Sequence, residues 1–143
     1  MEERVLANKL DLNIFNSGVK CVEVGKLTDE MIKFLNLSRN PGSIVLWNDR
    51  FKYIEKHKND FQSEEEYYKH IQEIPNIIEN PDYLGLHPKD NSIQFIKRID
   101  ALMLVGVRIK NQGSLSIRSS YPISEDQLKT YIASNTAWKF GNS

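Results

Sequence analysis

The chain has 143 residues, of which 40% are hydrophobic and 27% charged, and its formal net charge is zero. This length is typical of one domain with its own core, and the zero net charge weighs slightly against nonspecific binding of nucleic acid. The single cysteine, Cys21, excludes an internal disulfide and a zinc site built from several cysteines. No apolar run is long enough to cross a membrane, and residues 1–12 lack the apolar core of a signal peptide. We therefore expect a single cytoplasmic domain over residues 1–143, with no metal and no other cofactor.

The charge is unevenly distributed along the chain. Residues 49–82 carry five basic and nine acidic side chains, whereas residues 89–118 carry six basic and two acidic ones. Segregation of this kind is usually solvated surface charge. The alternative interpretation is a sheet that binds anions and faces away from an acidic layer of helices.

The first third of the chain is predicted to alternate strands and helices. Residues 1–17 are expected to form a loose N-terminal segment, and the alternating pattern of residues 19–24 predicts a strand. Thr28 fits the N-cap of the helix that follows, since its hydroxyl can accept a hydrogen bond from a free backbone N–H. Residues 43–47 then predict a short buried strand, and Asn48 fits the cap of the next helix.

Two further helical segments are predicted in the middle of the chain. Ser63 and Glu66 have the spacing of a capping box, in which each side chain bonds to the backbone of the other residue. Pro75 can start a further helical turn and Pro81 can end it. Both segments precede the part of the chain that is rich in strands.

The last third of the chain changes to strands. Three strand-like runs cover residues 92–99, 101–109 and 114–121. Ser124 starts a capped C-terminal helix, and residues 134–143 are expected to be a tail. This order of elements predicts an α+β fold, with helices packed on an antiparallel sheet.

The sequence carries no motif that identifies its chemistry on its own. It lacks a P-loop, a dinucleotide fingerprint, a zinc-protease motif and a nucleophile elbow, and its three histidines have no partner at metal-ligand spacing. One lysine is unusual: Lys97 alternates with Ile93, Phe95 and Ile99, so it shares a strand face with apolar residues. The polar residues that could form a site are His57, Lys97, Arg108, Arg118, Ser119, Ser120 and Tyr121.

Five stretches in a fixed order resemble a known family. They read VEVGKLTDEMIKFLNL, IVLWNDRFKYIEKH, ENPDYLGLHPKDNSIQFIKRID, LVGVRI and IRSSYPI. From about Val22 to Ile132 the chain resembles the phage-associated branch of the barnase–EndoU–colicin E5/D–RelE-like nucleases. The resemblance implies the fold of a small metal-independent ribonuclease, in which helices lie on one side of a curved antiparallel sheet.

The resemblance also implies a site drawn from one helix and the sheet. The histidine after YIEK matches the family's helix histidine and would act as acid or base, while a lysine and an arginine would stabilise phosphate charge. The strand end, which usually reads Thr-x-Tyr in the family, reads Ser-Ser-Tyr here. Lys97 would face inward because the concave sheet face is the substrate cleft. The expected catalytic residues are His57, Lys97, Arg108, Ser119 and Tyr121, and the expected substrate-binding residues are His87, Lys89, Arg98, Arg118 and Ser120.

Each of these residues also has a simpler explanation. His57 could be a surface residue favoured by the helix dipole, and Lys97 could protect a sheet edge. Arg108 could pair with Asp100. Tyr53 stands where some relatives carry a further histidine, which weakens the argument for catalysis by two histidines.

Three functions are therefore compared. The first is a metal-independent endoribonuclease that cleaves RNA, for example tRNA, by attack of the 2′-OH. Such an enzyme would be a toxin or an effector of a phage or mobile element, with a cognate inhibitor or immunity protein as its partner. The second is a non-catalytic module of the same fold that binds RNA or protein. The third is an interaction protein of a mobile element, with an exposed apolar patch around Trp138.

Overall fold

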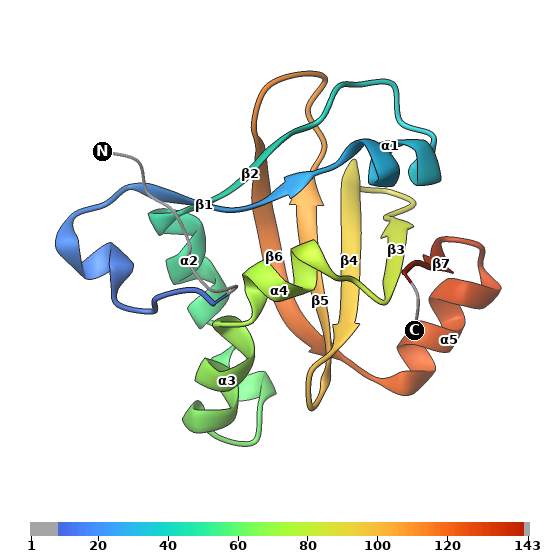
Figure 1. Cartoon of the computed structure of the whole chain (residues 1–143). Coiled ribbons are helices and arrows are strands. Elements are labelled where there is room, and N and C mark those ends of the chain that lie inside the picture. The colour runs from blue at the N-terminus through green and yellow to red at the C-terminus, as the bar shows by residue number, and fades with distance from the viewer. Residues whose placement is uncertain (1–8, 142–143) are drawn as a thin grey trace.

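The computed structural model describes residues 9–141, in which seven strands form one open sheet (Figure 1). The spatial order is β1-β2-β6-β5-β4-β3-β7, and neighbouring strands are antiparallel except β2 and β6. The predicted α+β class is confirmed. The parallel pair lies where the antiparallel pair of β1 and β2, which α1 connects, meets the antiparallel run β6-β5-β4-β3-β7. The strands are β1 Cys21–Leu27, β2 Gly42–Trp47, β3 Tyr83–Leu86, β4 Ser92–Arg98, β5 Leu102–Arg108, β6 Leu115–Ile123 and β7 Ala137–Lys139.

Short helices connect and flank these strands, and within residues 9–141 no helix has the length and apolar character to span a bilayer. The hydroxyls of Thr28, Ser63 and Ser124 each accept a backbone N–H three residues later, as predicted. Ser124 and Gln127 form the full capping box, whereas only the serine half forms at Ser63. The helices are α1 Asp29–Leu35, α2 Asn48–Glu55, α3 Glu64–Ile71, α4 Ile74–Glu79 and α5 Glu125–Ala133, with 3₁₀ turns at Ile14–Ser17 and Lys58–Asp60.

One face of the sheet is covered by α4, which crosses in front of the strands in Figure 1. Ile77 and Ile78 of α4 are fully buried in the main core cluster together with Phe95, Met103 and Val105 of the sheet. Because side chains alternate along a strand, these sheet residues share one face. This face is the interior of the protein.

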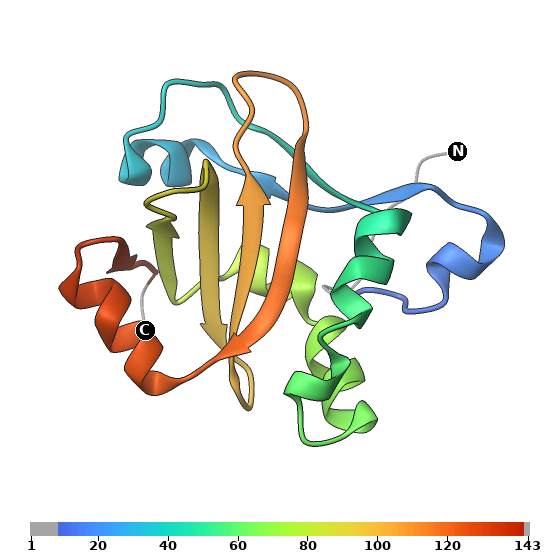
Figure 2. The ribbon, with the colours of Figure 1, turned by 180° about the vertical axis from the view of Figure 1, so that it is seen from behind.

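The opposite face is covered only at its side by α5. Leu128 of α5 packs in a second cluster with Ile96, Leu104 and Ile123, which alternate with the residues of the main core. Figure 2 shows this face of β4, β5 and β6 lying between α2 and α5, with no described helix across its centre. The uncovered strip beside β6 is therefore where polar side chains can reach solvent.

Both ends of the described chain pack more closely than expected. Leu10 is buried and its N–H donates to the carbonyl of Gln72, and the Phe15 ring lies 5.1 Å from that of Phe51, so residues 9–17 are not loose. The expectation for residues 1–8 lies outside the described residues. In the expected C-terminal tail, β7 pairs with β3, where a Cβ on Gly85 would lie 2.2 Å from the Thr136 carbonyl.

Candidate functional site

One face of α2 and the turn after it supply half of a pocket. Arg50, Tyr53 and His57 follow the i, i+3, i+7 spacing that brings side chains to one side of a helix. The Arg50 guanidinium lies 4.8 Å from the centre of the Tyr53 ring, and the Tyr53 and His57 rings are 5.8 Å apart. The three side chains therefore form a continuous strip that ends at the imidazole.

A carboxylate holds the His57 ring. Nδ1 of His57 lies 3.1 Å from Oδ2 of Asp60, in the short 3₁₀ turn that follows α2. A hydrogen donated by Nδ1 to the carboxylate fixes the tautomer in which Nε2 is the acceptor. The His57 side chain is 37% exposed, so solvent or a ligand can reach the imidazole. His57 is thus equipped to accept a proton.

An irregularity in β6 supplies the other half of the pocket. The pairing of β5 with β6 shifts by one residue after Gly106, which pairs with Ser119, while Val107 pairs with Ile117. Arg118 is the extra residue of this bulge and turns toward the same side as Ser119. Gly106 has no Cβ, and one placed there would lie 2.9 Å from the Ser119 hydroxyl. The bulge therefore brings a guanidinium and a hydroxyl to the open face together.

The two halves face each other across a pocket of about 360 Å³. The rings of His57 and Tyr121 have centroids 6.2 Å apart, and Nε of Arg118 lies 3.5 Å from Oδ2 of Asp90. An imidazole, two guanidinium groups, three hydroxyls and two carboxylates thus share one small volume. The lining residues are Arg50, Tyr53, His57, Asp60, Asp90, Arg118, Ser119 and Tyr121.

Tyr121 is a neutral hydrogen-bond donor in this pocket. Burial raises the pKa of its phenol above the usual value, and the nearby Tyr131 and Asp90 raise that pKa further. The phenol therefore keeps its proton at neutral pH. It can donate to an anion but is not suited to act as a base.

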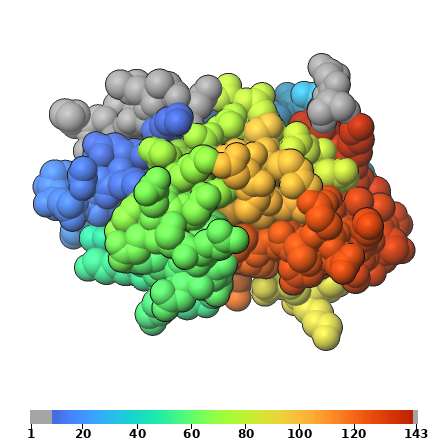
Figure 3. Space-filling view, turned by 90° about the horizontal axis from the view of Figure 1, so that it is seen from below, coloured from blue at the N-terminus to red at the C-terminus, as the bar shows by residue number. Residues whose placement is uncertain are grey.

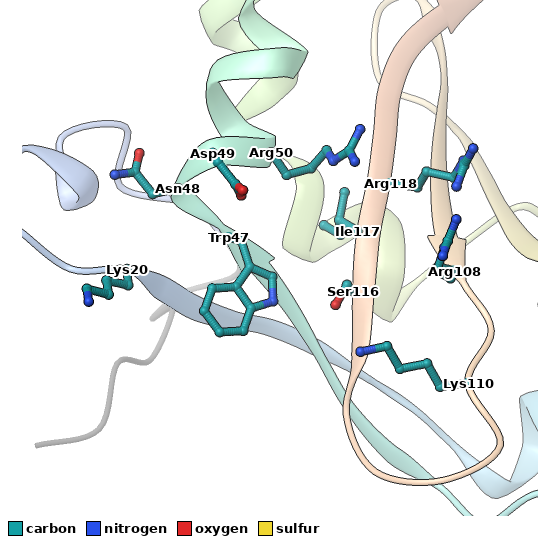
Figure 4. A pocket seen from close by; sticks show the side chains of 10 residues that line it. All are labelled: Lys20, Trp47, Asn48, Asp49, Arg50, Arg108, Lys110, Ser116, Ile117 and Arg118. Atoms are coloured by element: carbon teal, nitrogen blue, oxygen red, sulfur yellow. The ribbon is translucent and has the colours of Figure 1, made fainter.

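A second, larger pocket of about 610 Å³ adjoins the first (Figure 4). Arg50 and Arg118 line both pockets, so the two lie side by side. Arg108, expected beside His57, lines only this second pocket. The alternative in which Arg108 pairs with Asp100 does not hold: Asp100 precedes the start of β5, pairs with Lys69, and lies at the opposite end of the strand from Arg108. The lining residues are Lys20, Trp47, Asn48, Asp49, Arg50, Arg108, Lys110, Ser116, Ile117 and Arg118.

Lys97 lies on the other face of the sheet, which corrects its expected position in the cleft. It alternates with Ile93 and Phe95, as predicted, but that face is the one that α4 covers. At the end of the strand its Nζ lies 3.6 Å from Oδ1 of Asp82. Lys97 therefore belongs to a local ion pair away from the imidazole.

Two of the expected substrate-binding residues, Ser120 and Arg98, lie outside the pocket of His57. Ser120 is fully buried, since it points to the core side while its neighbours Ser119 and Tyr121 line the pocket. Arg98 lies near α5, where it pairs with Glu125. Neither residue lines the pocket of His57.

His87 and Lys89 belong to the turn between β3 and β4. Nδ1 of His87 accepts the backbone N–H groups of Lys89 and Asp90, at 3.1 and 3.0 Å. Lys89 is exposed, and neither side chain lines the two pockets. The turn contributes to the site through Asp90, whose carboxylate contacts Arg118.

Sequence reasoning missed several residues of the site. Arg50, Asp60, Asp90 and Trp47 were not among the expected site residues, although the spacing of Arg50, Tyr53 and His57 is a signal that could have identified the first. Tyr53, considered only as a missing histidine, is part of the site. Within residues 9–141, no three His, Cys, Asp or Glu side chains gather as metal ligands would.

The protein is thus an α+β domain with an open sheet, and one sheet face carries a histidine-containing pocket beside a basic one. Residues 22–130 match the family described as phage-Barnase-EndoU-ColicinE5/D-RelE like nuclease3, and the chain belongs to this family. Its membership indicates nuclease activity and therefore a nucleic-acid substrate. Searches of curated proteins and of solved structures found no match.

Proposed function

We propose that the protein is a metal-independent endoribonuclease in which His57 is the general base. The observation that carries this proposal is the position of His57 between Asp60 and Tyr121, with the guanidinium groups of Arg50 and Arg118 in the same pocket. These groups supply the functions that cleavage of RNA needs without a metal: a base for the 2′-OH and cations for the phosphate.

In the proposed reaction, Nε2 of His57 takes the proton of a ribose 2′-OH. The 2′-oxygen forms a bond to phosphorus, and the bond between phosphorus and the 5′-oxygen breaks. A proton from solvent reaches the leaving 5′-oxygen, and His57 returns its proton to solvent. The products are a 2′,3′-cyclic phosphate and a free 5′-OH, so protons and bonds balance.

The remaining groups stabilise the charge that develops on the phosphate. Arginine presents several N–H donors in one plane, which suits two phosphate oxygens at once. Tyr121 donates from a phenol that its surroundings keep protonated. Ser119, brought to the same side by the bulge, offers one more hydroxyl.

An active nuclease of this kind would damage the RNA of any cell that makes it. We therefore infer that it serves as a toxin or as an effector of a phage or mobile element, acting on cytoplasmic RNA such as tRNA. A cognate inhibitor or immunity protein with an acidic surface would cover the basic cleft beside β6.

A second candidate function is a non-catalytic module that binds RNA or protein. Tyr53 favours it, since a tyrosine stands beside His57 where some relatives carry a further histidine. Such a module would use the same cations and aromatic rings but would leave the RNA intact.

The test compares an RNA with a DNA of the same sequence, in the presence of the purified protein. We expect cleavage of the RNA alone, and fragments that end in a 2′,3′-cyclic phosphate, because DNA lacks the attacking 2′-OH. An RNA that carries one 2′-deoxy residue should resist cleavage at that position. Binding of RNA without cleavage would overturn the enzyme and favour the binding module.

A further inference from the structure

Trp47 is a large aromatic side chain that remains exposed beside the catalytic pocket. Trp47 is the last residue of β2 and the N-cap of α2, and 44% of its surface is exposed. Figure 4 shows its indole in the pocket between Lys20 on one side and Ser116 and Lys110 on the other. An exposed indole in a hollow offers a flat apolar surface for a ligand.

The pocket around Trp47 is strongly basic. Its lining includes five cationic side chains but only one carboxylate, that of Asp49. Within residues 9–141, Arg118 is the one cation of the five that forms an ion pair with a carboxylate. The others are available to an anion. The cations are Lys20, Arg50, Arg108, Lys110 and Arg118.

The basic pocket adjoins the pocket of His57. Arg50 on α2 and Arg118 on β6 line both volumes, so a chain with one phosphate at His57 can extend past these guanidinium groups toward Trp47. A polyanion that alternates phosphates with flat bases fits this surface better than an acidic peptide does, because every nucleotide carries both a charge and a ring, whereas an acidic side chain carries only the charge.

We propose that Trp47 stacks on an unpaired base next to the cleaved bond, and that Lys20, Arg108 and Lys110 bind the adjoining phosphates. A base can stack on the indole only if one of its faces is free, and in a duplex both faces are covered by neighbouring bases. The substrate class is therefore single-stranded RNA, or an unpaired loop of a folded RNA. This inference rests on the proposed function, since it assumes that RNA occupies the neighbouring pocket.

Tryptophan fluorescence tests this assignment, because the chain has two tryptophans in different places. Trp138 lies in β7 at the other side of the sheet, where its indole N–H donates to Asn135. The full chain with His57→Ala, which removes the proposed general base and so slows cleavage, is combined with Trp138→Phe in one protein and with Trp47→Phe in another. A short single-stranded RNA should quench the first protein and leave the emission of the second unchanged.

Affinity measurements on the same His57→Ala background complete the test. Trp47→Ala should weaken binding of the single strand roughly tenfold or more, the usual effect of removing one stacking partner. It should change binding of the matching duplex little. Trp138→Ala is the control for loss of a tryptophan, and circular dichroism checks that each variant is folded.

The outcomes separate this inference from the proposed function. If wild type cleaves RNA but Trp47→Ala binds the single strand as tightly as its parent, the stacking assignment is wrong and the nuclease remains. If wild type binds single strands through Trp47 but cleaves none, the assignment of Trp47 stands and the enzyme is wrong. Equal loss of single-strand and duplex affinity would reduce Trp47 to a structural role and overturn the inference.

Discussion

Tyr121 illustrates how the surroundings of one residue decide its chemical role. Its phenol is partly buried, and its raised pKa means that the folded protein holds the proton more tightly than the unfolded chain does. The stability that follows from this is present below the ordinary tyrosine pKa, about 10, and is lost as pH rises through the higher folded value.

Tyr121→Phe should therefore make the stability of the protein less sensitive to alkali. We expect wild type to lose unfolding free energy above about pH 10 more steeply than Tyr121→Phe, because only wild type must ionise this buried phenol. Urea unfolding at neutral and alkaline pH measures the difference. Tyr53→Phe is the control, because Tyr53 is exposed. Identical alkaline losses in wild type and Tyr121→Phe would contradict the raised pKa.

At the residue scale, the resemblance identified some residues of the pocket but not the carboxylates that contact them. His57, Ser119 and Tyr121 are assigned by resemblance, and the structure places them in one pocket. Asp60 and Asp90 could not be assigned in this way. Each lies in a turn, and its contact with His57 or Arg118 depends on how that turn folds.

At the scale of elements, His70 connects α3 to the turn between β4 and β5. The side chain is only 2% exposed, and its Nδ1 lies 2.7 Å from the Glu66 carbonyl oxygen. Nε2 accepts the N–H of Ala101 at 3.0 Å, and the ring stacks on Phe61. The space-filling view from below shows α3 packed beside the turn between β4 and β5 (Figure 3). A neutral imidazole that both donates and accepts fits this position.

His70→Ala should lower the free energy of unfolding by about 2–3 kcal/mol, because it removes buried contacts of the imidazole and leaves the Ala101 N–H without its acceptor. Lys69→Ala is a matched control. Lys69 joins the same two segments through Asp100, but that pair is exposed and screened by solvent, so little stability should be lost. Urea unfolding compares the two variants. Equal losses, or no loss in His70→Ala, would contradict the role assigned to the histidine.

The position of Lys97 shows where strand patterns stop being informative. Alternation correctly places it on the face of Ile93 and Phe95. Alternation does not say which face a helix will cover, because that depends on the path of the chain from β2 through α4 to β3. Here α4 covers the face of Lys97, and the opposite face carries the pocket. A similar limit applies to β7, a three-residue strand whose pairing with β3 depends on distant contacts.

At the scale of the whole molecule, the basic segment of the sequence divides into two regions. Arg108, Lys110 and Arg118 gather around the pockets beside β6, as expected for a sheet that binds anions. Lys97 and Arg98 form ion pairs with carboxylates elsewhere. The net charge of residues 89–118 therefore indicated a basic surface. It did not indicate which lysines and arginines of that segment would form the surface.

The measurement that tests the account most directly is RNA cleavage in EDTA by wild type, His57→Ala and Lys97→Ala. EDTA removes cleavage by contaminating nucleases that need a metal. We predict that wild type cleaves, that His57→Ala loses about 10²–10⁴-fold in rate, and that Lys97→Ala retains nearly full activity because it lies on the opposite face. Full activity in His57→Ala, or a comparable loss in Lys97→Ala, would contradict the site described here.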